Sequence, residues 1–145
     1  RIVVLDQVTD PHNIGAIARS ASAFGANALI LQEKNTPPIN AIMAKSACGG
    51  VETLPFIYVV NISRTIESLK QAGYWCVGLD EHTNTLLKNT NINGKVALIL
   101  GAEGEGLRRL TKENCDELAK LPTSGLVQSL NVSNACAISL YELAR

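Results

Sequence analysis

Three polar segments of this chain carry residues that could do chemistry, and they lie at positions 10–19, 101–106 and 121–133. The middle segment, Gly101-Ala-Glu-Gly-Glu-Gly106, follows an apolar run, as phosphate-binding loops do. The dinucleotide pattern G-x-G-x-x-G fails because Glu103 stands at its third position. The P-loop pattern fails because Leu107 and Arg108 follow, where a lysine and a serine or threonine are required. What remains is a tight loop whose backbone can approach a flat ligand, with a simple turn as the alternative.

The segment at 121–133 has the composition of a second ligand-binding loop. Pro122 ends a strand and Gly125 permits a sharp bend before a helix begins. Ser129, Asn131 and Ser133 then crowd polar side chains at the helix start. One of them is expected to cap the helix, but three in five positions exceed what one cap needs. The surplus predicts a polar pocket.

The segment at 10–19 contains the pattern Asn13-x-Gly15-x-x-x-Arg19. Because helical side chains lean toward the N-terminus, we expect the Arg19 guanidinium to lie across bare Gly15 and reach the Asn13 end. An anion there would also meet free helix N–H groups, so the pattern predicts a phosphate or ribose clamp. A solvated surface arginine is the alternative.

Composition bounds the class of protein. The chain has 145 residues, 46% hydrophobic and 18% charged, which fits one globular domain and excludes disorder. No apolar run approaches the roughly 20 residues of a membrane span. Thirteen basic and thirteen acidic residues cancel, which argues against a nucleic-acid partner unless a local patch or a second domain supplies the grip. The chain begins at Arg1, from which we expect an N-terminal part to have been removed.

The cysteines and histidines do not predict a metal site. The chain contains no C-x-x-C pair, and His12 and His82 are isolated from one another. We expect reduced and mostly buried thiols of a cytoplasmic protein at Cys48, Cys76, Cys115 and Cys136.

Apolar runs at even intervals predict the strands of a parallel sheet covered on both faces, at 2–5, 28–31, 56–60, 75–79 and 96–100. Between them we expect helices, the first capped by Asn13 and ended by Gly25, and others at 40–47 and 63–72. The first should bury Ile14, Ile17, Ala18, Ala21 and Phe24 on one face. The alternation predicts an α/β doubly wound fold.

The rest of the chain predicts a short strand, a final helix and a polar connection. A short strand is expected at 118–121, and a final helix at 132–145 with Val132, Cys136, Leu140 and Leu143 on one stripe. Residues 80–94, rich in Asn and Thr, are expected to form a polar surface connection that carries little chemistry.

Together the three segments resemble the signature motifs of the SpoU/TrmH family of RNA ribose 2′-O-methyltransferases, in the SPOUT superfamily, and the resemblance covers essentially the whole chain. It implies a C-terminal trefoil knot, which patterning alone cannot show and which general topology disfavours. It also implies S-adenosyl-L-methionine as cofactor, bound by Leu100, Gly101, Gly106, Leu121, Pro122, Gly125, Ser129 and Leu130. The implied catalytic residues are Asn13, Arg19, Glu103, Ser129 and Asn131. Thr123-Ser124 departs from the family pattern, where a methionine and a small residue are common.

Within the family, the segments at 8–13, 47–49, 101–111 and 115–118 resemble a bacterial subgroup that methylates a guanosine ribose of large-subunit rRNA. The resemblance implies RNA as partner, a homodimer paired through the first and last helices, and a catalytic domain at 1–145 that lacks the subgroup's N-terminal RNA-binding domain. Three alternatives stay open: a tRNA ribose methyltransferase, a non-catalytic RNA-binding or dimerisation module of the same fold, and an unrelated nucleotide-dependent enzyme.

The implied reaction needs a group that helps to remove a proton from the ribose 2′-OH. His12 lies beside the first motif and is a candidate base. The resemblance assigns this role to the arginine, but an arginine scarcely deprotonates in a protein. We therefore expect Arg19 to bind phosphate and stabilise the transition state, with Glu103 orienting Arg19 or Asn13.

Overall fold

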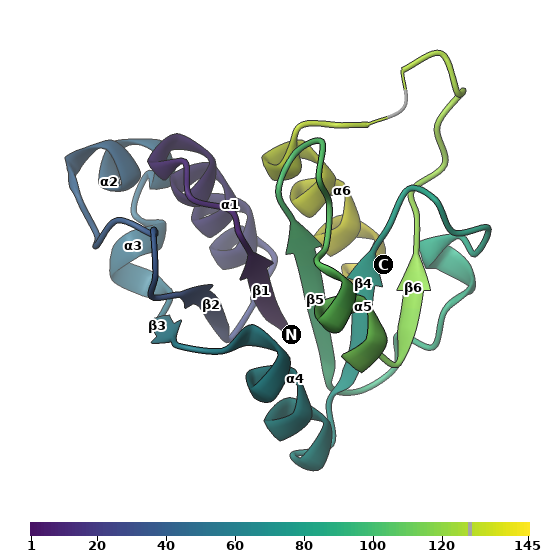
Figure 1. Cartoon of the computed structure of the whole chain (residues 1–145). Helices are drawn as coiled ribbons and strands as arrows, with labels where there is room; N and C mark the ends of the chain where they lie inside the picture. Colours follow the sequence, from purple (N-terminus) through teal and green to yellow (C-terminus); the bar gives the residue numbers. More distant parts are fainter. Residues whose placement is uncertain (128) are drawn as a thin grey trace.

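The computed structural model describes residues 1–127 and 129–145. Its centre is a parallel sheet of six strands in the order β3-β2-β1-β5-β4-β6, and every neighbouring pair runs parallel. Figure 1 shows the sheet with its helices around it. The strands are β1 (Ile2–Asp6), β2 (Ala28–Gln32), β3 (Phe56–Val59), β4 (Trp75–Leu79), β5 (Val96–Gly101) and β6 (Glu117–Ala119).

Helices cover both faces of this sheet. They are α1 (Pro11–Ala23), α2 (Ala41–Ala47), α3 (Gly50–Thr53), α4 (Ile62–Gln71), α5 (Arg109–Asn114) and α6 (Val132–Ala144), with a 3-10 turn η1 at Leu87–Asn89. α1 packs against α2, α3 and α6, whereas α4 packs against α5. The predicted α/β class, with a parallel sheet and helices on both faces, is confirmed.

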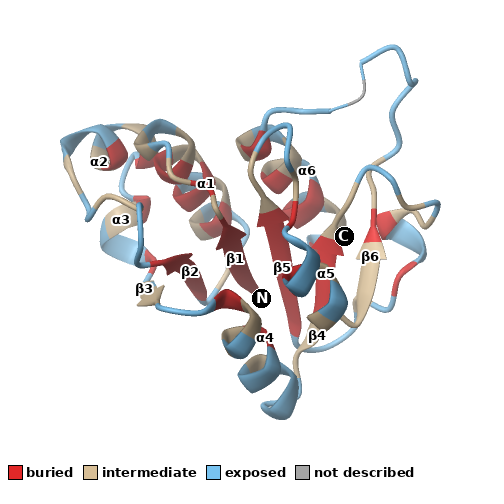
Figure 2. Ribbon diagram, viewed as in Figure 1, coloured by how far each residue is buried: buried red, intermediate tan, exposed pale blue. Residues whose placement is uncertain are grey.

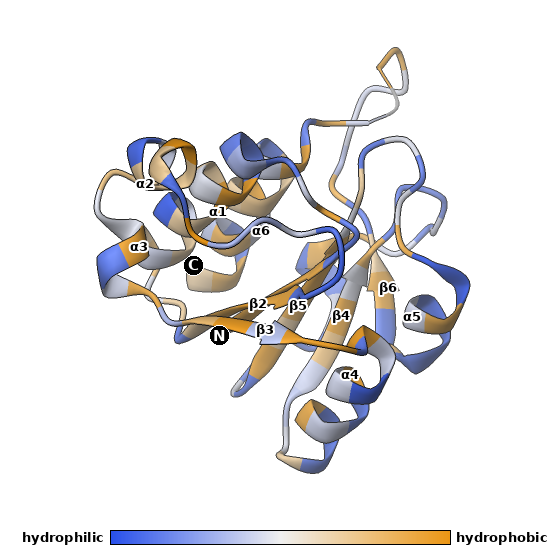
Figure 3. Cartoon of the chain, turned by 60° about the vertical axis from the view of Figure 1, so that its left-hand side comes forward, coloured by the Kyte–Doolittle hydropathy of each residue, from blue (hydrophilic) through white to orange (hydrophobic). Residues whose placement is uncertain are grey.

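The strands separate two apolar cores. Val3 and Leu5 belong to the core that contains α1 and α6, and Ile2 and Val4 to the core that contains α4. This alternation follows from the two-residue period of a strand. Because both faces are covered, central strands are buried along their length, as the red arrows of β1 and β5 show in Figure 2. In Figure 3 the strands at the centre of the fold carry much of the orange, hydrophobic colour.

The expected elements are present, with corrections at their ends. α1 is capped by Asp10, whose side chain accepts from the His12 N–H, so Asn13 lies within the first helical turn and is not the cap. Gly25 does follow the end of this helix, at φ 75°. Phe24 is 37% exposed and lies outside the core that was expected to include it. α6 buries its predicted stripe of Val132, Cys136, Leu140 and Leu143.

The last strand also differs from the expected range 118–121. β6 pairs with β4, which ends at Leu79 opposite Ala119, and beyond this point Lys120 forms only an isolated parallel bridge with Leu86. The short helices α3 and α5 were not predicted, because four and six residues carry too little periodicity.

Gly15 does not lie beneath Arg19 as expected. A Cβ at this position would stand 2.5 Å from the Met43 carbonyl oxygen and 2.6 Å from Ser46 Cβ, so Gly15 lets α2 approach α1. Arg19 follows Gly15 by four positions, but α2 occupies the space beside Gly15.

We therefore expect Gly15→Ala to destabilise the fold by about 1–3 kcal/mol, because it overpacks the α1–α2 contact against backbone. Urea unfolding followed by circular dichroism measures this change. Ser20→Ala on the same helix is the control and should stay within about 0.5 kcal/mol of the parent. Equal stability of Gly15→Ala and the parent would refute the close packing.

Candidate cofactor and nucleic-acid site

A cavity of about 170 Å³ opens at the carboxyl end of the sheet. In Figure 1 the arrowheads of β1, β5, β4 and β6 point toward the end where its loops lie. Its walls come from residues 79–82 at the end of β4, from 100–106 at the end of β5, and from part of the connection between β6 and α6, namely Lys120, Leu121, Thr123, Ser129, Leu130 and Val132. Parallel strands bring these separate loops together because their carboxyl ends meet at one edge.

The glycine loop forms one wall, and its shape depends on close backbone approach. A Cβ on Gly101 would stand 2.2 Å from the Gly106 carbonyl carbon, which no side chain tolerates. The Gly106 N–H donates to the Ala102 carbonyl at 2.8 Å and closes the loop on itself. Gly104 and Gly106 have φ values of 80° and 69°, which favour glycine. The loop therefore has a fixed shape rather than that of a plain turn.

A polar network joins this loop to the start of α6. Glu103 Oε1 accepts from Asn131 Nδ2 at 2.7 Å and from the Val132 N–H at 3.1 Å. Asn131 Nδ2 also lies 3.3 Å from Asn13 Oδ1 on α1. Asn13 and Asn131 are 118 positions apart in the sequence. The fold brings both together with Glu103. Glu103 contacts Asn131 directly and neither Arg19 nor Asn13, contrary to expectation.

Asn131 is the capping residue that the sequence left undecided among three. Its Oδ1 accepts from the Ser133 N–H at 2.9 Å and from the Asn134 N–H at 3.4 Å, and it also contacts Ser133 Oγ. Glu103 places a carboxylate at the same helix N-terminus, where the helix dipole favours negative charge. Ser129 takes no part in the cap and lines the cavity instead.

Most predicted cofactor-binding residues line the cavity, namely Leu100, Gly101, Gly106, Leu121, Ser129 and Leu130. Pro122 and Gly125 do not line it. Gly125 has φ 88° and makes the expected bend in the exposed loop. These two residues therefore shape the loop between β6 and α6 and do not form part of the cavity surface.

Arg19 lies apart from this cavity. It lines a second hollow formed by the end of α1, the residues after α2, and α3. On an ideal helix Arg19 stands about 9 Å along the axis and about 120° around it from Asn13. Within one chain, the arginine and the Asn13–Glu103–Asn131 cluster do not share a cavity.

The connection after β4 contributes to the cavity, contrary to the expectation that it carries little chemistry. Asp80, Glu81 and His82 line the wall opposite the glycine loop, together with Lys112 and Lys120. Lys112 Nζ lies 3.6 Å from Asp80 Oδ2, so one of these two lysines is already paired. The only sequence signal for this wall is its position directly after an apolar strand. Leu87 of η1, in the same connection, is buried.

The two histidines do not form a common site. His12 is exposed, and its Nδ1 lies 2.8 Å from Ser46 Oγ on α2, outside the cavity lining. His82 Nε2 lies 3.6 Å from Glu81 Oε1 at the cavity. Among residues 1–127 and 129–145, no group of three His, Cys, Asp or Glu side chains is placed to hold a metal ion.

The thiols are free and mostly unreactive. Burial raises the pKa of Cys76 to about 11, and the pKa values of Cys115 and Cys136 each to about 12. These thiols therefore stay protonated at neutral pH and are poor nucleophiles. Cys48 is exposed, so three of the four fit the expectation of covered thiols.

Asp6, at the end of β1, is a fully buried carboxylate that the sequence analysis overlooked. Arg108 donates two hydrogen bonds to it, from its backbone N–H to Oδ2 at 3.0 Å and from Nε to Oδ1 at 2.7 Å, and its Nη2 forms an ion pair with Oδ1 at 2.7 Å. A buried charge is tolerated only when it is paired and hydrogen-bonded, and Arg108 supplies both conditions.

Comparison with known proteins assigns this arrangement of fold and cavity to a family. The pattern of the SpoU rRNA Methylase family matches residues 1–141, and the chain belongs to this family. It is 49% identical over 144 residues to a 23S rRNA (guanosine-2′-O-)-methyltransferase RlmB from Coxiella burnetii. That alignment covers 99% of the chain but 58% of the relative, so the chain spans less than two thirds of that protein's length.

Solved structures share the fold. The SpoU methyltransferase AviRb from Streptomyces viridochromogenes, in complex with the cofactor AdoMet, has a TM-score of 0.90 at 31% identity. The alignment covers 99% of this chain and 56% of that protein. A TrmH/SpoU tRNA modifying enzyme from A. aeolicus has a TM-score of 0.89 at 27% identity, with 99% of this chain and 73% of that one covered.

Proposed function

We propose that this chain is the catalytic domain of an S-adenosyl-L-methionine-dependent RNA ribose 2′-O-methyltransferase whose substrate is a guanosine of 23S rRNA. Family membership and the 49% identity to an RlmB protein support the reaction and the substrate. The observation that carries the proposal is the joining of Asn13, Glu103 and Asn131 beside the glycine-loop cavity. An rRNA substrate also agrees with a cytoplasmic protein. The likeness to a tRNA modifying enzyme keeps tRNA as the second candidate substrate.

The charge of the cavity supports this cofactor over a polyphosphate nucleotide. Four carboxylates line it, from Asp80, Glu81, Glu103 and Glu105, against two lysines, one of them paired with Asp80. An acidic cavity attracts a ligand with sulfonium and ammonium charges and repels phosphates. Leu100, Leu121, Leu130 and Val132 supply apolar surface for an adenine ring.

The residues of this chain would act by positioning. The bound cofactor would supply a methyl group on a sulfonium for attack by the ribose oxygen. Ser129, at the cavity, and Asn131, held by Glu103, would orient the ribose, while Asn13 fixes Asn131 from α1. Arg19 would bind the RNA phosphate and stabilise charge in the transition state.

We also propose that the C-terminal segment is threaded as a trefoil knot. The likeness of the whole chain to SpoU methyltransferase structures supports it. β6 is an edge strand, separated from β1 by β4 and β5. After β6 the chain returns across this distance, and α6 packs against α1. Such a return is the course that a threaded segment requires.

A homodimer is the third part of the proposal. Small residues on the first and last helices would permit close packing between copies, but Ala18 and Ala21 are fully buried within the chain. The exposed apolar residues beside them are Phe24, Ile138 and Tyr141, with Phe24 and Tyr141 in edge-to-face contact at 6.2 Å between ring centroids. Pairing through α1 and α6 would cover these residues and bring Arg19 near the cavity of the second copy.

We expect the chain to bind S-adenosylhomocysteine, and Gly101→Ala to abolish binding, because the added Cβ breaks the glycine loop. Calorimetry with S-adenosylhomocysteine, NAD and ATP measures both. Gly94→Ala is the matched control, a loop glycine at φ 79° with open space around it, and should bind normally. Heat from NAD or ATP, with none from S-adenosylhomocysteine, would refute the proposed cofactor.

We expect Tyr141→Asp to shift the protein from dimer to monomer, because a charge cannot be buried unpaired in an apolar contact. Sedimentation velocity at micromolar concentration measures the mass against the 15.5 kDa chain. The control is Leu110→Asp on α5, a side chain of similar exposure (54% against 56%) on the opposite face of the sheet. A monomeric parent protein, or equal behaviour of both variants, would contradict pairing through α6.

We expect Arg19→Ala to leave S-adenosylhomocysteine binding unchanged and to lower methyl transfer on the order of a hundredfold or more, because a donor to developing charge is lost. Arg19→Lys should recover little, since the planar fork is absent. Assays use the full-length gene product on rRNA fragments and tRNA side by side, with exposed Arg64→Ala as control.

Recovery of activity on mixing Arg19→Ala with Asn131→Ala would support a site shared between copies. Parental rates in Arg19→Ala would refute its role. A loss of cofactor affinity equal to the loss of rate would place Arg19 in the cofactor site instead.

A further inference from the structure

Asp6 is a buried charge that the proposed reaction does not use. It is completely buried, and neither Asp6 nor Arg108 lines the cavity. Its two hydrogen bonds and its ion pair all involve one residue, Arg108. Removing a carboxylate from water is costly, and an apolar side chain of similar size would avoid that cost. The contact therefore calls for an explanation beyond packing.

The position of the pair relative to the glycine loop supplies that explanation. Asp6 is the register partner of Gly101 across β1 and β5, so the loop begins beside Asp6. Arg108 immediately precedes α5, so the loop ends at the residue that Asp6 binds. Both ends of residues 101–108 thus lie at Asp6: the start pairs with its strand, and the end is held by its carboxylate. The Gly106-to-Ala102 hydrogen bond closes the middle.

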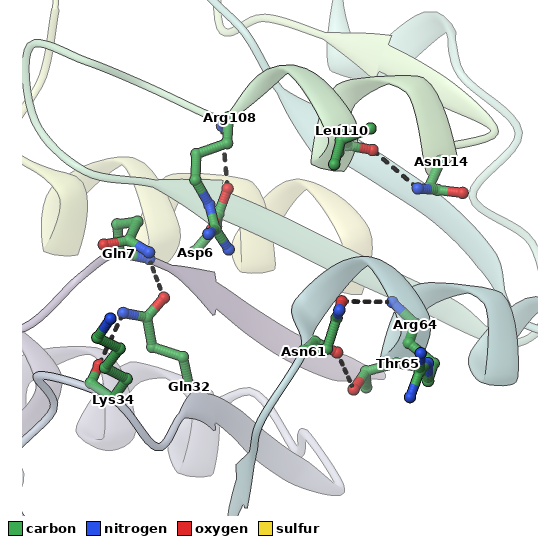
Figure 4. A network of polar contacts seen from close by, with 10 residues as sticks. All are labelled: Asp6, Gln7, Gln32, Lys34, Asn61, Arg64, Thr65, Arg108, Leu110 and Asn114. Atoms are coloured by element: carbon green, nitrogen blue, oxygen red, sulfur yellow. Dashed lines mark hydrogen bonds and ion pairs between the residues drawn. The ribbon is translucent and has the colours of Figure 1, made fainter.

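Asp6 is itself held in place from the other side. Gln7 follows at φ 66°, and its N–H donates to Gln32 Oε1 at 3.0 Å. Gln32 Nε2 in turn donates to the Lys34 carbonyl at 2.9 Å, beyond the end of β2. Figure 4 shows Arg108 reaching Asp6 from the start of α5. It also shows Gln32, the last residue of β2, linking Gln7 to Lys34. The carboxylate is therefore a fixed anchor.

We propose that Asp6 and Arg108 are a positioning pair that sets the conformation of the glycine loop and thereby the affinity for the S-adenosyl cofactor. This inference rests on the proposed function for the identity of the ligand. The pair acts through residues 101–106 and touches no reacting atom. Its loss should therefore raise the KM for cofactor and leave kcat at saturating cofactor nearly unchanged.

Adjacent arginines give a matched test. Arg109 forms an exposed ion pair with Glu113 at 3.0 Å, one residue after Arg108. Arg108→Lys keeps a charge beside Asp6 but loses the planar donors, and we expect it to weaken S-adenosylhomocysteine binding by about tenfold or more. Arg109→Lys should bind as the parent does. Calorimetry on residues 1–145 measures both, with thermal melting to show that each variant is folded at the temperature used.

Two further variants separate positioning from stability alone. Arg108→Gln leaves the Asp6 carboxylate buried and unpaired, so it should bind worst, and adding Asp6→Asn should recover part of the lost affinity. Hydrogen exchange at the amides of 102–107 should quicken in Arg108→Lys and not in Arg109→Lys. A folded Arg108→Lys with parental affinity and parental exchange overturns the proposal.

The remaining outcomes also decide between explanations. Unchanged cofactor affinity with weaker binding of RNA would make Arg108 an RNA contact and overturn its positioning role. A parental chain that binds no S-adenosylhomocysteine, while loop exchange still responds to Arg108→Lys, would refute the proposed function and support the positioning of the loop by the pair.

Discussion

The site depends on how the chain leaves the carboxyl ends of β1 and β5 at the centre of a parallel sheet. After β1 the chain turns to α1 on one face, and after β5 it passes through the glycine loop to α5 on the other. Adjacent strands that depart to opposite faces leave a crevice between their ends, and open α/β sheets bind ligands at such points. The cavity described here lies beside this division, bounded by the loop from β5.

A crevice of this kind needs polar groups to hold its walls, and Asn131, Glu103 and Asp6 also accept from backbone N–H groups. Asn131 and Glu103 cap the start of α6, and Asn13 holds Asn131 from the first turn of α1. Asp6 takes the N–H that precedes α5. The first N–H groups of a helix have no partner within the helix. A side chain that accepts from them is held in place by these hydrogen bonds. Rigid placement is what orientation of a substrate requires.

Overall neutrality of the chain conceals a local arrangement of charge. Thirteen acidic and thirteen basic residues cancel, yet carboxylates outnumber lysines at the cavity, and Arg19 lies apart in its own hollow. The proposed RNA methyltransferase would face two ligands of opposite character, a cationic cofactor and a polyanion. Separating acidic and basic groups on one chain serves both, and net charge alone could not have indicated it.

The sequence by itself determined the architecture and the two segments, 101–106 and 121–133, that supply much of the cavity wall. Apolar runs with glycines and prolines after them located the strands and the loops that follow, because continuous burial and special φ angles restrict residue types locally. Cap choice was less certain: Asp10 and Asn13 are both good caps three residues apart, and only the helix start distinguishes them.

What the tertiary structure decided is which residues meet. No periodicity reveals that α2 occupies the bare side of Gly15, that residues 80–82 form a cavity wall, or that Asp6 binds a residue 102 positions away. These contacts arise from strand order in the sheet, which long-range packing sets. A single sequence encodes that order only through the summed energy of the whole fold.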